Sequence, residues 1–109
     1  MKTIASPNQT AINLNPFVLD AIKQNHRTLA FQPPLSLKPK LDEDDEPLLV
    51  IEEKALNLHI YAPTHEQLRE NLVSELFFLW DEYANEPTEN LTLKAQQIKA
   101  NLLARCKEH

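Results

Sequence analysis

The stretch LLVIEEKALNLHIYAPTHEQLRENLVSELFFLWDEYA, residues 48–84, decides the fold of this chain. Its first four residues form a continuous apolar run, and from Leu56 to Ala62 apolar and polar side chains alternate. A continuous run predicts a buried strand, and alternation predicts a strand with one face in the core. With a turn at residues 52–55 between them, the two strands are expected to form a β-hairpin.

A long helix is expected directly after this hairpin. Thr64 and Gln67 fit the S/T-x-x-E/Q capping box, and the helix should extend to Ala84, before Asn85-Glu86-Pro87. At about 100° per residue, its apolar side chains cover about half of the circumference, with Phe78 on the otherwise polar side. One sheet face does not cover so broad an arc. The rest should contact a second helix, the N-terminal segment or another chain.

A second C-terminal helix is expected from Thr92 to about Lys107. It carries a narrower apolar stripe, made of Leu91, Ala95, Ile98, Leu102 and Cys106. Cys106 is the only cysteine, so no internal disulfide can form, and its place on the stripe predicts a small core residue.

The residues before the hairpin are less regular. Residues 1–10 are a polar tail, and a short strand is expected at residues 10–15. Asn15 and Pro16 have the residue types of a helix start, which predicts a short N-terminal helix to about Arg27. Residues 29–31 are expected to be extended, and the prolines within residues 32–40 exclude a helix and favour an edge strand. The acidic stretch 42–47 is expected to be a solvated loop.

Together these patterns predict one α+β domain over residues 1–109. It should contain a small antiparallel sheet of about three strands, packed against two C-terminal helices. The chain has no glycine and eight prolines, so its turns should depend on Pro, Asn and Asp. Without glycine, the chain has no Walker loop, dinucleotide-binding loop or G-x-S-x-G elbow.

The composition also restricts partners and location. The formal net charge of −5 makes nucleic-acid binding unfavourable, because an acidic body repels phosphates. No run approaches the roughly 18 apolar residues of a membrane span, and the N-terminal residues do not resemble a signal peptide. A cytoplasmic protein without membrane contact is therefore expected.

No catalytic, cofactor-binding or metal-binding residues are predicted. His59 and His65 lie six residues apart with Glu66 nearby, but this is not the spacing of a metal site, and a surface position or a partner contact is the favoured interpretation. The serines have no histidine base at a recognisable spacing. We expect a protein that is not an enzyme and has no cofactor.

Residues 56–83 resemble the last strand and helix of HicB-like antitoxins. In that family a strand precedes a Thr-x-Glu-Glu-type helix start, followed by a helix with leucine at every fourth position and a tryptophan near its end. The matching residues here are Leu58, Ile60, Tyr61, Thr64, Glu66, Leu68, Leu72, Leu76 and Trp80. The glycine-containing turn before the strand and the C-terminal DNA-binding unit of that family are missing. The resemblance implies a partial HicB-like fold that caps a small basic toxin nuclease without binding operator DNA.

These observations favour a non-enzymatic protein-binding module, with antitoxin-like neutralisation of a small basic toxin as its most concrete form. The alternative is a homodimeric structural or assembly subunit that associates through the broad apolar arc of the first C-terminal helix. An enzyme of unrecognised type is the third hypothesis. Acidic and aromatic side chains are the partner-binding candidates, since they suit a basic partner and commonly dominate interface energy: Glu52, Glu53, Tyr61, Phe77, Phe78 and Trp80.

Overall fold

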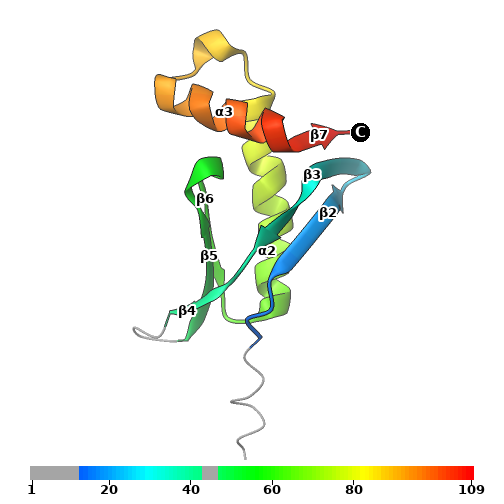
Figure 1. Ribbon diagram of the computed structural model, residues 1–109, viewed down its shortest axis with the longest axis vertical. Helices are drawn as coiled ribbons and strands as arrows, with labels where there is room; N and C mark the ends of the chain where they lie inside the picture. Colours follow the sequence, from blue (N-terminus) through cyan, green and yellow to red (C-terminus); the bar gives the residue numbers. More distant parts are fainter. Residues whose placement is uncertain (1–12, 43–46) are drawn as a thin grey trace, which may run out of the picture.

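The computed structural model describes residues 13–42 and 47–109 of the chain. The fold is α+β, with two three-stranded antiparallel sheets of order β2-β3-β7 and β4-β5-β6, and two C-terminal helices. Helix α2 lies in the middle, with β2 and β3 on one side and β5 and β6 on the other, and α3 crosses near its C-terminal end (Figure 1). The predicted fold class is confirmed, although the strands form two sheets instead of one.

The predicted hairpin is present. Strands β5 (Leu48–Glu53) and β6 (Leu58–Ala62) pair without interruption, from Leu49 opposite Ala62 to Glu53 opposite Leu58. A 3₁₀ turn (Lys54–Leu56) joins them, and Asn57 follows with a φ of 58°. Asparagine tolerates this left-handed conformation better than most residues, so it replaces the missing glycine. The short strand β4 (Lys40–Asp42) pairs with the other edge of β5.

The prediction of an N-terminal helix from Pro16 to Arg27 was wrong, because Phe17–Gln24 form strand β2. Apolar residues at 17, 21 and 22 suit a helical period, but the buried residues are Phe17, Leu19 and Ile22. A register shift between Leu19 and Ala21 interrupts the alternation, which obscured the strand in the sequence.

The turn after β2 contains Asn25 and His26, both with positive φ, as a tight two-residue hairpin requires. Strand β3 (Arg27–Leu37) confirms the extended stretch expected at residues 29–31, where it is the central strand between β2 and β7. Beyond Phe31 it pairs with β2 alone among the described residues, so residues 32–37 are at a sheet edge, as predicted. Its prolines are tolerated because residues 31–34 fall in the register shift, between Ala30 opposite Ala21 and Leu35 opposite Leu19. The Gln32–Pro33 peptide is cis.

Helix α2 (His65–Leu79) continues into a π-helical segment (Trp80–Ala84), so the predicted end at Ala84 is confirmed. Thr64 Oγ1 accepts a hydrogen bond from the backbone N–H of Gln67 at 3.1 Å, as the capping box predicts. The Thr64 hydroxyl also contacts Gln67 Oε1 at 3.4 Å. No helix in the described part of the chain is long and apolar enough to cross a membrane.

Helix α3 (Leu93–Arg105) starts as predicted, with Thr92 Oγ1 accepting from Ala95 N at 3.1 Å. It ends earlier than predicted, because the next three residues form strand β7 (Cys106–Glu108). Cys106 lies opposite Phe31 in β3, so the C-terminal residues complete the first sheet. A short 3₁₀ turn (Thr88–Asn90) precedes α3.

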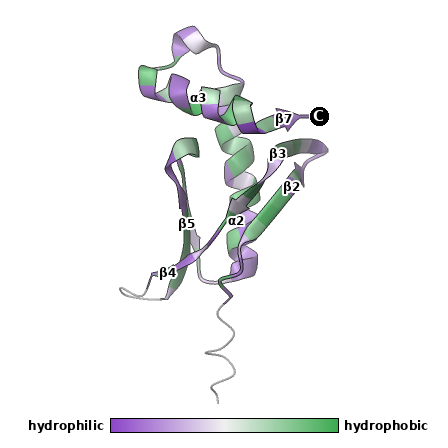
Figure 2. Cartoon of the chain, viewed as in Figure 1, coloured by the Kyte–Doolittle hydropathy of each residue, from purple (hydrophilic) through white to green (hydrophobic). Residues whose placement is uncertain are grey.

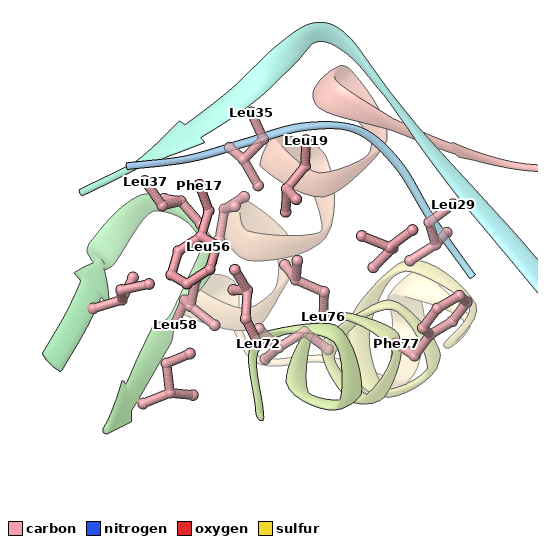
Figure 3. Close-up of a cluster of buried hydrophobic side chains, with 14 of the residues drawn as sticks. Phe17, Leu19, Leu29, Leu35, Leu37, Leu56, Leu58, Leu72, Leu76 and Phe77 are labelled. Atoms are coloured by element: carbon pink, nitrogen blue, oxygen red, sulfur yellow. The ribbon is translucent and has the colours of Figure 1, made fainter. Parts of the chain in front are cut away.

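The two sheets and both helices share one core. Phe17, Leu19 and Leu35 extend into it from the first sheet, toward Leu72 and Leu76 of α2 (Figure 3). Hydrophobic and hydrophilic residues intermix along α2, consistent with a helix that buries some faces and exposes another (Figure 2).

The apolar arc of α2 is therefore covered within a single chain. Its buried residues face both sheets and α3: Leu68, Leu72, Leu76, Phe77, Leu79, Trp80 and Ala84. Of the three neighbours expected for the rest of this arc, the N-terminal segment and the second helix are present, and no other chain is needed, because β2 forms a second wall where a helix had been predicted. The large hydrophobic residue of α2 that stays exposed is Phe78, on the polar side.

Three predicted features fall wholly or partly outside the described residues. They are the polar tail at 1–10, the first half of the short strand at 10–15 and most of the acidic loop at 42–47. Asp42 is described, and it ends β4. Residues 13–15 are described and are not a strand.

Candidate functional site

A shallow groove of about 510 Å³ lies along β6, where this strand meets α2. Tyr61 and Phe78 border it and are 59% and 54% exposed. The remaining lining residues come from the same two elements: His59 and Ile60 of β6, and Asn71, Ser74 and Glu75 of α2. We call these seven residues the β6–α2 groove.

Two different periodicities bring the groove residues together. In β6, alternation buries Leu58 and Ile60 and turns His59 and Tyr61 outward. In α2, residues 71, 74, 75 and 78 are spaced by three or four, so they share one helix face, beside the buried leucines. The groove forms because α2 packs against β6 with this polar face left uncovered.

Hydrogen bonds hold the walls of the groove. Asn71 Nδ2 donates to the backbone oxygen of Tyr61 at 3.1 Å, which links the helix to the strand edge. Gln24 Nε2 of β2 donates to Ser74 Oγ at 3.0 Å on the other side of the helix face. These contacts order the walls and leave both aromatic rings exposed.

The groove and its border are acidic. Glu75 is part of the lining, which among the described residues includes no lysine or arginine. Glu52 is exposed beside the groove, with Oε2 at 3.6 Å from Nδ1 of His59, a contact that is an ion pair only when the imidazole is protonated. Glu82 is also exposed, four residues after Phe78. Such a surface attracts cationic groups.

A second aromatic and charged cluster lies near the C-terminal end of α2, and we call it the Arg27 clamp. The guanidinium of Arg27 donates to both carboxylate oxygens of Asp81, at 2.7 and 2.9 Å, and its Nε donates to Glu108 Oε2 at 2.8 Å. Its central carbon lies 5.1 Å from the centroid of the Phe77 ring. Trp80 Nε1 donates to Glu108 Oε1 at 2.9 Å. The clamp ties the β2–β3 hairpin, α2 and β7 together.

The charges of this clamp compensate one another. Hydrogen bonds from Arg27 lower the pKa of Asp81 and of Glu108, and Trp80 adds to the effect on Glu108. The same bonds raise the pKa of Arg27. Both carboxylates therefore stay ionised with a paired cation, and a planar guanidinium with two carboxylate partners is a stabilising geometry. The clamp is a structural element of the fold.

The structure separates the predicted partner-binding residues. Tyr61 and Phe78 meet in the groove, and Glu52 lies beside it. Phe77 and Trp80 are buried, at 2% and 6% exposure, so they do not reach the surface. Glu53 is half-buried and lines a different cavity, of about 260 Å³, between the hairpin and α3.

Sequence reasoning missed Asn71, Ser74 and Glu75. Their signal was present, because together with Phe78 they follow a helical period on the polar face of α2. Phe78 itself was predicted, and these polar residues, one and two helical turns before it, are its neighbours on that face.

Cys106 and His65 are both held in contacts within the fold. Cys106 is buried, and burial raises the pKa of its thiol to about 11, in line with the predicted core position. His65 stacks on Phe17, with ring centroids 4.2 Å apart, and its Nε2 lies 3.1 Å from the backbone oxygen of Asn15. Residues 13–42 and 47–109 contain no group of three or more His, Cys, Asp or Glu side chains suited to a metal ion.

Comparison with known proteins gave no match: no family model, curated protein or solved structure is similar to this chain. The resemblance of residues 56–83 to HicB-like antitoxins therefore remains a prediction.

Proposed function

We propose that this chain is a protein-binding module whose contact surface is the β6–α2 groove. The observation that carries the proposal is the exposure of Tyr61 and Phe78, side by side on two different elements. The chain has only seven aromatic residues, and five of them contribute to the core or pack against it. Exposed aromatic pairs in a concave setting are typical of the centre of a protein interface.

The partner in this proposal is basic. The chain has a net charge of −5, Glu75 lines the groove together with the aromatic pair, and Glu52 contacts His59 of the same lining. Opposite charge on a partner accelerates encounter, and like charge is rejected, so this surface selects for lysine- or arginine-rich proteins. Neutralisation of a small basic toxin is the most concrete form of this function, and it agrees with what the HicB-like resemblance implies.

Homodimerisation through α2 has less support. That hypothesis rested on an apolar arc too broad for one chain to cover, and the arc is buried by β2, β6 and α3. A second copy would also bring its own glutamates to the same surface, which like charges disfavour. The proposal assigns no catalytic step to the chain.

The proposal is tested by removing the aromatic pair. Tyr61→Ala combined with Phe78→Ala should abolish co-purification of a basic protein from the native host, identified by mass spectrometry and then rebuilt from two purified components. The matched control is Leu93→Ala with Leu103→Ala, since these side chains on α3 are also exposed, at 84% and 52%. The control should bind like the wild type.

The antitoxin form adds a growth assay. If the identified partner arrests growth, wild-type chain and the α3 control should restore it, and the groove variant should not. Equal affinity of the groove variant and the wild type for the purified partner would refute the proposed surface. A partner that shows no effect on growth would exclude the antitoxin form and leave the binding module.

A further inference from the structure

The four sheet edges of this fold differ in how well they are protected against another strand. The edge strand β2 has a register shift at its centre, and β4 and β7 have three residues each. Bulges and short lengths are common ways of blocking strand addition. Strand β6 has five residues in unbroken register, no lysine and no internal proline, so it is the least protected edge.

The backbone of β6 is oriented for such an addition. Its one strand neighbour among the described residues is β5, and the backbone oxygen of Tyr61 faces away from β5 toward Asn71. Because backbone direction alternates along a strand, the N–H of Tyr61 and both backbone groups of His59 face the same open side. That side borders the β6–α2 groove.

We infer that the groove receives an extended, lysine- or arginine-bearing segment of the partner, which pairs with β6 as an additional strand. This inference rests on the proposed binding function and specifies its mode. Strand addition supplies affinity through main-chain hydrogen bonds, and side-chain pockets supply specificity. In the free protein, the backbone oxygen of Tyr61 accepts a hydrogen bond from the Asn71 side chain. In the complex, a backbone N–H of the partner donates to this oxygen in place of Asn71.

The side chains around the edge suit alternating apolar and basic residues in the added strand. Residues on its inner side meet Phe78 and Glu75, where the stem of a lysine packs on the ring and its ammonium reaches the carboxylate. Residues on its outer side lie beside Tyr61 and His59, as cross-strand neighbours do. Charge selects this occupant over a second copy of the chain, whose β6 would bring another Glu75 and Glu52 to the same edge.

The probe for this inference is a short synthetic peptide in which valine alternates with lysine, with blocked ends. The comparison peptide alternates valine with glutamate, so it has the same spacing and the opposite charge. Binding of the lysine peptide should slow hydrogen exchange of the His59 and Tyr61 amides, measured by NMR, and leave that of Ile60 unchanged because it already faces β5. The glutamate peptide should bind at least about tenfold more weakly.

A backbone variant isolates the main-chain contribution. His59→Pro removes an outward N–H at a position where an edge strand tolerates proline, and it should weaken peptide binding about tenfold relative to His59→Ala, which keeps the N–H. Circular dichroism of both variants checks that the hairpin is intact. The amide-exchange experiment uses the wild-type chain, so it decides the question even if His59→Pro does not fold.

The outcomes separate this inference from the proposed function. Peptide binding that shifts Phe78 signals without protecting the His59 and Tyr61 amides overturns strand addition and leaves the contact surface in place. Absence of lysine-peptide binding at millimolar concentration, or self-association of the chain through β6 in its place, also overturns it. The proposed contact surface is tested separately. It is refuted if the Tyr61 and Phe78 double variant still binds the native partner.

Discussion

The Arg27 clamp and the β6–α2 groove are built from the same kinds of side chain, and both involve α2. Each combines aromatic rings with carboxylates, and Phe77 of one is the sequence neighbour of Phe78 of the other. They differ in what completes them. Arg27 supplies the cation of the clamp from within the chain, whereas among the described residues no lysine or arginine lines the groove.

This difference shows that composition alone does not separate a structural cluster from an exposed, candidate contact surface. What matters is whether the fold itself provides the complementary charge and the covering surface. In the clamp, Arg27 of β3 provides the charge, and it lies over the Phe77 ring. In the groove, the described residues supply no such cation, and under the proposed function a partner supplies it. That asymmetry gives the two clusters opposite expected responses to mutation.

The largest expected effect comes from substituting the two neighbouring phenylalanines. Phe77→Ala should lower the free energy of unfolding by about 3–5 kcal/mol, since it removes a buried ring and leaves a cavity. Phe78→Ala should change it by less than about 0.5 kcal/mol, because the ring is half exposed and alanine favours the helix. Urea denaturation followed by circular dichroism measures both. Similar losses of unfolding free energy for the two variants would contradict the assignment of Phe77 to the structural clamp and of Phe78 to the exposed groove.

A smaller loss is expected from opening the clamp. Arg27→Ala leaves Asp81 and Glu108 without their shared cation, so the unfolding midpoint in urea should fall, by less than for Phe77→Ala. Arg69→Ala is the matched control, because it removes an exposed arginine on α2 that lies outside the clamp, and it should leave the midpoint unchanged. Added salt should reduce the difference in unfolding midpoint between wild type and Arg27→Ala, because part of the stabilisation by Arg27 is electrostatic. If both arginine variants behave alike, the clamp contributes nothing measurable.

The smallest effect concerns acid stability. Arg27 lowers the folded-state pKa of Asp81 and Glu108 below their ordinary values of 3.8 and 4.5. Their stabilisation is therefore complete above the ordinary values and is lost as pH falls through the lowered folded-state values. Wild type should lose more stability than Arg27→Ala between about pH 7 and pH 3, as judged by urea midpoints. Parallel losses in the two proteins would exclude this linkage.

Much of the fold could be predicted from the sequence wherever the apolar residues followed a single strand or helix period. Alternation in β6 and the run in β5 fixed the hairpin, and Thr64 and Thr92 correctly marked the starts of both helices. Strand β2 was missed because its register shift breaks the alternation and mimics a helical period. Strand β7 was missed because three residues are too few to show any period, and their pairing with β3 decides their conformation.

The candidate site divides in the same way. Tyr61 and Phe78 were both predicted contact residues, and each sits outside its element's apolar pattern, so the sequence marked them as exposed. Phe77 and Trp80 were predicted with them and are buried, since the sequence did not show that β2 packs on α2 and α3 on the segment that follows it.

The sequence by itself determined the local elements from Leu48 to Ala84, the absence of glycine-dependent loops and the acidic charge, because these depend on neighbouring residues or on composition alone. Only the tertiary structure decided that β2 and β7 are strands, that Arg27 meets Asp81 and Glu108, and that β6 lies beside Phe78 with β5 as its one strand neighbour in the described part of the chain. The physical reason is that strand pairing and burial depend on residues far apart in the chain. Whether a side chain is covered is settled by its partners in space, which no local pattern specifies.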